Sequence, residues 1–116
     1  EELLRRIARR EIEGLASCIA LMEINWALYE RGESAKAEKA SSLIEELVEV
    51  VSLDRETAKQ AIDAKIARRL ELLDSIHVMT AVVQDAIFVT RDEDLRTKCR
   101  DLASIRTPEE ILEKKE

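Results

Sequence analysis

Residues 72–94 have the sequence LLDSIHVMTAVVQDAIFVTRDED, and this segment sets the fold class. Within it, residues 75–84 are mostly apolar on every side, which predicts a buried helix. Residues 86–90 (AIFVT) form a fully apolar run, which predicts a strand buried on both faces. A buried helix followed at once by such a strand is typical of a parallel sheet covered by helices.

The rest of the chain continues this alternation. Ser34 and Asp54 are predicted to cap the helices that follow them. Gly14 and Gly32 are predicted to end the first two helices. The pattern predicts an α/β domain with a parallel sheet covered on both faces, in a single domain over residues 1–116. Further strands are predicted at residues 15–19, 48–53 and 103–106, and further helices at residues 1–13, 20–31, 37–47, 55–70 and 91–99.

Composition excludes several classes of protein. A chain of 116 residues is too short for two independently folded catalytic domains. A net charge of −6 argues against a uniformly basic nucleic-acid surface, so any RNA contact has to be local. Cys18, Cys99 and the single His77 do not form a zinc motif, and no apolar stretch approaches the roughly 20 residues of a membrane helix. These features predict a cytoplasmic protein with free thiols and no membrane contact.

Four carboxylates occupy positions that call for an explanation. Glu23 shares a predicted helix face with apolar neighbours, so it either binds a metal or lies at the rim of its helix. Asp74 opens a buried helix, either as its N-cap or as a functional group. Asp92 directly follows the strand at 86–90, again as a cap or as a group in the crevice at the strand ends. Asp94 is either a solvated acid of the first helical turn or an auxiliary ligand.

If three of these carboxylates converge, their mutual repulsion requires cations. Carboxylate oxygens suit Mg²⁺ or Mn²⁺, and both metals accept the same ligands. Two such ions can activate a water molecule and stabilise the leaving oxygen of a phosphodiester.

Three runs of the sequence resemble successive acidic motifs of the PIN domain family. They are CIALMEINWAL with Glu23, LLDSIHVMTAVV with Asp74 and AIFVTRDEDL with Asp92, and the resemblance spans roughly residues 15–112. The compact length is similar to that of the VapC-type toxins. The resemblance implies a three-layer α/β/α fold and a metal-dependent endoribonuclease, the toxin of a toxin–antitoxin pair, which cleaves RNA with Mg²⁺ or Mn²⁺.

The resemblance also implies roles and partners. Glu23, Asp74 and Asp92 would be the catalytic metal ligands, with Asp94 as an auxiliary acid. Homodimers and inhibition by a cognate antitoxin are common in such proteins. Arg91 is the best candidate for holding an RNA phosphate, and His77 is more simply explained as a core residue or as a partner of Asp74.

One feature departs from the family pattern. PIN domains open with a central strand that carries a first Asp, whereas no Asp precedes Asp54 here. We therefore expect an additional strand, from the same polypeptide or from a partner, to lie between residues 15–19 and 86–90, because unpaired buried backbone groups are costly.

Two alternatives to a nuclease stay open: a catalytically inactive PIN-like binding or scaffold module, and a helical oligomerisation module. Trp26 and Phe88 fall in core-facing patterns, so stacking of unpaired bases is not expected. The arginines of residues 5–10 predict either a salt-bridged solvated face or a contact surface for RNA or a second subunit.

Overall fold

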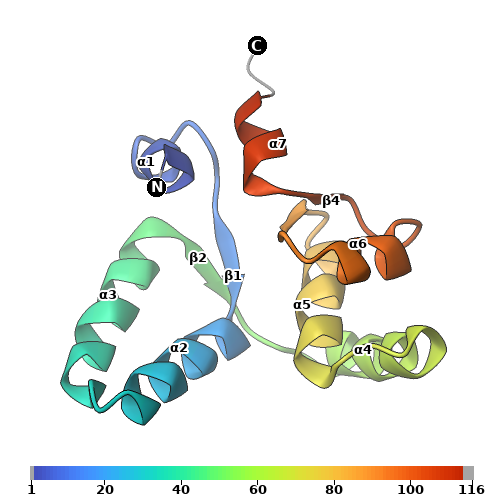
Figure 1. Cartoon of the computed structure of the whole chain (residues 1–116), viewed down its shortest axis with the longest axis horizontal. Coiled ribbons are helices and arrows are strands. Elements are labelled where there is room, and N and C mark those ends of the chain that lie inside the picture. The colour runs from blue at the N-terminus through green and yellow to red at the C-terminus, as the bar shows by residue number, and fades with distance from the viewer. Residues whose placement is uncertain (1, 114–116) are drawn as a thin grey trace. The chain divides into compact units, whose positions relative to one another are not determined.

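Helices and short strands alternate along residues 2–113, which are the residues that the computed structural model describes. The chain forms two compact units, Glu1–Ser52 and Leu53–Glu116. Figure 1 shows the elements of each. Each unit contains one two-stranded parallel sheet flanked by helices.

The first unit is built on the strand pair of β1 and β2, with Leu15 opposite Glu49 and Ser17 opposite Val51. Glu49 N donates a hydrogen bond to Gly14 O (2.9 Å), which extends the pairing by one residue. The elements of this unit are α1 (Glu2–Ala8), β1 (Leu15–Ser17), α2 (Cys18–Glu30), the 3-10 turn η1 (Ser34–Lys36), α3 (Ala37–Leu47) and β2 (Glu49–Val51).

Helix α1 ends at Ala8, five residues before the predicted end at residue 13. Arg10 adopts a left-handed conformation (φ 64°). Arg10 N donates to Ile7 O (3.0 Å) and Glu11 N donates to Arg6 O (2.9 Å), the hydrogen-bond pattern of a Schellman C-cap. The prediction was wrong because a residue with positive φ ends this helix before Gly14 is reached.

Helix α2 begins at Cys18, so the predicted strand at 15–19 is shortened to Leu15–Ser17. The cause is a local cap, because the Ser17 side chain accepts a hydrogen bond from Ile19 N (3.1 Å). The predicted cap at Ser34 was wrong: Ser34 begins η1, and α3 starts after Lys36 with no side-chain cap.

The second unit has its core between two helices and a strand pair. Helices α4 and α5 pack along each other, and Ala61, Val78 and Met79 are buried there. Phe88 lies opposite Ile105 in the parallel pair of β3 and β4. The elements of this unit are α4 (Arg55–Arg68), α5 (Leu72–Val83), β3 (Phe88–Val89), α6 (Glu93–Cys99), β4 (Ile105–Arg106) and α7 (Pro108–Glu113).

The structure confirms two predicted caps and corrects a third. Asp54 Oδ1 accepts from Thr57 N (2.8 Å), and Asp92 Oδ1 accepts from Leu95 N (3.1 Å). Asp74 is not an N-cap, because α5 begins two residues earlier at Leu72, with Glu71 at the cap position. Asp74 therefore lies in the first helical turn, where its negative charge interacts favourably with the helix dipole.

Several predictions about burial were wrong or only partly confirmed. Helix α5 is buried on one side only, at Ser75, Ile76, Val78, Met79 and Ala81, whereas Val83 is 41% exposed. The strand predicted at residues 86–90 to be buried on both faces was wrong: it is shortened to Phe88–Val89, and Ile87 and Val89 are 49% and 36% exposed. Trp26 is 59% exposed, so its assignment to the core was wrong, and Phe88 is only partly buried. Helical periodicity placed Trp26 among apolar residues of α2, but Met22 on the same helix is also exposed, at 64%.

Within residues 2–113, none of the helices combines the length and apolarity needed to cross a lipid bilayer.

Candidate functional site

The acidic residues of the second unit lie at the starts of two helices. Asp92 directly precedes α6 and caps it, because its Oδ1 accepts a hydrogen bond from Leu95 N. One oxygen of this carboxylate is therefore engaged in the helix cap. Asp94 lies in the first turn of the same helix, and its Oδ2 is 3.2 Å from Lys98 Nζ. Both residues follow β3 in sequence, at the carboxyl end of a parallel strand, where α/β folds place their ligands.

Asp74 is held by helix α5. Its neighbours Ser75 and Ile76 are fully or almost fully buried, whereas Asp74 itself is half-buried. Its charge reaches α6, because it contributes to raising the pKa of the Cys99 thiol. The main cause of that raised pKa is burial of Cys99, which disfavours the thiolate.

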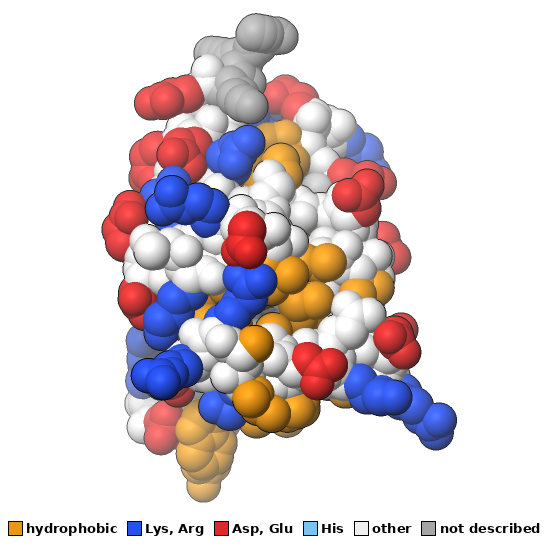
Figure 2. Space-filling model, turned by 90° about the vertical axis from the view of Figure 1, so that its right-hand side faces the viewer, with side chains coloured by type: hydrophobic (Ala, Val, Ile, Leu, Met, Phe, Trp, Pro, Cys, Tyr) orange, Lys and Arg blue, Asp and Glu red, His pale blue; other side chains and the backbone are white. Residues whose placement is uncertain are grey.

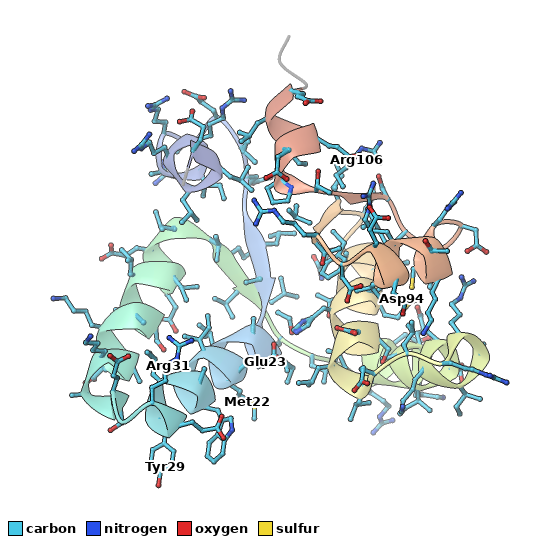
Figure 3. The ribbon with its side chains drawn as sticks, in the orientation of Figure 1. Met22, Glu23, Tyr29, Arg31, Asp94 and Arg106 are labelled. Atoms are coloured by element: carbon cyan, nitrogen blue, oxygen red, sulfur yellow. The ribbon has the colours of Figure 1, made fainter. Side chains whose placement is uncertain are left out.

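Glu23 lies on α2 in the first unit, and its side chain is exposed (Figure 3). The structure thus brings Asp74, Asp92 and Asp94 into one unit and places Glu23 in the other. Within each unit, local helix geometry sets the position of the carboxylate.

The donor chemistry of these four residues fits Mg²⁺ or Mn²⁺, because all four present carboxylate oxygens, which are the hard ligands that both ions accept. Among the described residues, no three side chains of Asp, Glu, His or Cys lie close enough together to hold a metal ion. The fit therefore rests on the chemistry of the side chains.

Arg91, the predicted phosphate ligand, has a carboxylate partner. Its Nη2 is 2.6 Å from Glu109 Oε2, and its side chain is 71% exposed. This hydrogen bond raises the pKa of Arg91 and lowers that of Glu109. A phosphate at this position would compete with Glu109 for the guanidinium.

Arg5 and Arg6 of α1, and Arg9 in the turn after it, form salt bridges, as one of the two alternatives predicted. Arg5 and Arg6 each approach Glu2, at 3.5 and 3.6 Å, and Arg9 approaches Glu11 at 3.6 Å. These exposed pairs are worth little individually.

Sequence reasoning missed Arg106. It lies on β4, and it lines the same pocket as Arg96 and Arg100. The signal was weak, because a lone arginine at the end of a two-residue strand has no pattern that distinguishes it from any solvated arginine.

The fold elements and the acids after their strands define an α/β protein whose candidate chemistry lies at the strand ends. The family model of the PIN domain matches residues 1–101, and the chain belongs to this family. PIN domains are generally nucleases, which are hydrolases that typically use divalent metals, and they often occur in toxin–antitoxin systems. No curated protein matches the chain.

Proposed function

We propose that the protein is a metal-dependent endoribonuclease that acts in the cytoplasm as a VapC-type toxin of a toxin–antitoxin pair. The family match over residues 1–101 carries this proposal. Asp92 and Asp94 after β3, and Asp74 at the start of α5, support it because they stand in one unit.

Glu23, Asp74 and Asp92 would hold Mg²⁺ or Mn²⁺, with Asp94 as an auxiliary acid. A bound ion of this kind activates water and stabilises the leaving oxygen of a phosphodiester. The role of the chain itself is to hold the carboxylates at fixed positions. Helix α5 positions Asp74 through its buried neighbours, and the cap at Leu95 N orients Asp92.

The test is cleavage of a labelled RNA by the purified protein with Mg²⁺, with Mn²⁺ and with a chelator. We expect metal-dependent cleavage by the wild type and its loss in Glu23→Gln and Asp74→Asn, with cooperative thermal unfolding that shows each variant to be folded. The matched control is Asp63→Asn, which removes an exposed carboxylate from α4. Cleavage retained by both variants would contradict the assignment. Absence of metal binding by the wild type would favour the inactive binding or scaffold module.

The architecture proposed with this function is a three-layer domain spanning residues 1–116, with an additional strand between residues 15–19 and 86–90. In the described part of the chain, β1 pairs only with β2 and β3 only with β4, so each strand has a second edge that can accept a partner. Parallel sheets are normally buried, which supports an added strand. A structure in which these two segments pair directly would contradict it.

A homodimer is proposed through α2. Met22, Trp26 and Tyr29 are 64%, 59% and 62% exposed and follow helical spacing along one side of α2. Figure 3 labels Met22 and Tyr29 on this helix. The rings of Trp26 and Tyr29 stack with centroids 5.3 Å apart. Such an exposed apolar stripe is typical of an interaction surface. Light scattering should give a dimer mass that Trp26→Ser reduces to the monomer mass.

The same proposal includes a cognate antitoxin that covers the acidic residues. Its support is the family's frequent place in toxin–antitoxin systems. Growth arrest on expression of the wild type, relieved by Asp74→Asn, would support the toxin role, and equal growth of both strains would contradict it.

A further inference from the structure

A polar pocket of about 410 Å³ lies between α6 and the segment that leads into β4. Helix α6 contributes residues spaced three and four apart, so they lie along one side of the helix. Strand β4 closes the other side. The polar residues that line the pocket are Glu93, Arg96, Thr97, Arg100, Ser104 and Arg106.

The pocket is positively charged although the chain as a whole is acidic. Three arginines and one glutamate line it, against a net charge of −6 for the protein. Arg96 is already balanced, because it bonds Glu93 (2.9 Å) and Glu110 (3.1 Å). The excess positive charge therefore comes from Arg100 and Arg106.

Arg100 and Arg106 differ from the other arginines of this unit that line or flank α6. Arg68, Arg91 and Arg96 each form an ion pair with a carboxylate. Within residues 2–113, neither Arg100 nor Arg106 has a carboxylate oxygen within ion-pair distance. The pKa of Glu110 is lowered mainly by its hydrogen bond with the Thr107 backbone, and the charges of Arg96 and Arg106 add to this effect. Arg106 Nη1 donates a long hydrogen bond to Ile105 O (3.3 Å).

The position of Arg100 has a partial structural explanation, because a cation at the end of α6 interacts favourably with the helix dipole. That explanation does not extend to Arg106, which approaches the pocket from a strand. Figure 2 shows Lys and Arg side chains gathered toward the left of the face that it presents, with carboxylates among them.

We propose that Arg100 and Arg106 form a phosphate-binding pocket for the backbone of the RNA strand, beside Asp92 and Asp94: Arg106 O accepts a hydrogen bond from Thr90 N (3.0 Å), two residues before Asp92. This inference rests on the proposed function for the choice of RNA. Guanidinium groups bind phosphate oxygens through paired hydrogen bonds, and the Thr97 and Ser104 hydroxyls add donors.

The course of α6 links this pocket to the acidic residues. Asp92, Arg96 and Arg100 follow at intervals of four residues, and the eight residues from first to last span about 12 Å of helix. An RNA strand with its scissile phosphate at Asp92 would place a phosphate further along the same strand beside Arg100. The pocket would therefore set the register of the strand relative to the carboxylates.

Lining chemistry favours RNA over an acidic protein segment. Among the described residues, those that line the pocket include no aromatic side chain, and their apolar members are only Ala103 and Ile105, whereas protein interfaces are enriched in aromatic anchors. The same feature predicts that binding here does not discriminate between bases, because phosphate contacts position a strand without reading its sequence.

The experiment is binding of fluorescent single-stranded RNA by anisotropy, with a chelator present so that no cleavage occurs. The test variant is Arg100→Gln/Arg106→Gln. Its matched control is Arg55→Gln/Lys59→Gln, which removes the same charge from α4. Thermal unfolding verifies that each variant is folded, and Arg100→Lys, which keeps the charge but removes the guanidinium fork, is the second variant.

We expect the test variant to bind RNA about tenfold more weakly or worse, because two charge-assisted hydrogen-bonding groups are gone. The slope of log affinity against log salt should fall by about 1.4, or about 0.7 for each phosphate that is no longer neutralised. Arg100→Lys should fall between the wild type and the test variant. The control should keep the affinity of the wild type.

Equal binding by the test and control variants would overturn the pocket, as would failure of the wild type to bind RNA. The test variant and the wild type are also compared for binding of a polyglutamate peptide. If the test variant lost binding to this peptide but kept its affinity for RNA, the result would overturn the RNA pocket in favour of an acidic protein partner. The nuclease proposal is judged separately, by metal-dependent cleavage. A wild type that binds RNA through these arginines without cleaving it would support the pocket and contradict the nuclease.

Discussion

Arg68 at the end of α4 holds Asp101, 33 residues later in the chain, through two hydrogen bonds. Nη1 lies 2.6 Å from Oδ1 and Nη2 lies 3.3 Å from Oδ2. Nη1 also donates to Lys98 O (2.9 Å). One guanidinium thus joins the end of α4 to the end of α6 and the turn that follows.

This ion pair predicts a pH dependence of stability. The hydrogen bond from Arg68 lowers the pKa of Asp101 below its ordinary value. A carboxyl with a lowered folded-state pKa contributes stability above its unfolded pKa, and this stability is lost as the pH falls through the folded value. We expect acidification through and below the ordinary Asp range to destabilise the wild type more steeply than Asp101→Asn. Urea unfolding over a series of pH values measures this. Asp63→Asn, on the exposed side of α4, should parallel the wild type, and identical curves for all three proteins would contradict the prediction.

Asp92 is both the cap of α6 and a proposed metal ligand, and substitutions can separate these tasks. Asp92→Asn keeps a capping side chain, so the melting temperature should stay near that of the wild type while RNA cleavage is lost. Asp92→Ala should lower the melting temperature and also abolish RNA cleavage. Asp54→Ala removes the corresponding cap of α4, the bond of Oδ1 to Thr57 N, and should lower the melting temperature with cleavage intact in the folded protein. Full cleavage by Asp92→Asn would remove Asp92 from the metal ligands.

Burial of Cys99 predicts selective thiol chemistry. Cys99 is fully buried and burial raises the pKa of its thiol, whereas Cys18 is partly exposed. Alkylation of the native protein should modify Cys18 first, with Cys99 slower by about a hundredfold or more because it reacts only after local opening. Mass spectrometry of the single-cysteine variants Cys18→Ser and Cys99→Ser gives the two rates. Equal rates in the native state would show that α6 is not packed as described.

Gly14 is required where β2 approaches the first strand. A Cβ at this position would lie 2.8 Å from Val48 Cγ1 and 3.2 Å from Ile7 Cδ1. Gly14→Ala should therefore cost about 1–3 kcal/mol of unfolding free energy through overpacking. The control is the double variant Gly14→Ala/Val48→Ala, which removes the closest methyl group and should recover part of the loss in a double-mutant cycle. Strict additivity of the two substitutions would rule out this close approach as the cause.

Local signals were sufficient to locate most helices and the acids that follow the strands. The caps at Asp54 and Asp92 were predictable because an N-cap depends on a side chain and a backbone amide three residues apart. The same local reasoning wrongly predicted Asp74 as an N-cap, because α5 begins at Leu72, two residues before Asp74. The end of α1 was missed because arginine is rarely found at a left-handed position.

The contacts between distant segments were decided only by the tertiary structure. Nothing in the residues around Arg68 distinguishes Asp101 as its partner, and nothing around Arg100 indicates Arg106. Exposure of Trp26 shows the same limit, since an apolar residue at helical spacing fits a core face and an open face equally well. The caps at Asp54 and Asp92 depend on interactions within one turn and could be inferred from neighbouring residues. Ion pairs, pockets and exposure depend on the path of the chain between residues far apart in sequence, and that path is fixed only when the elements pack.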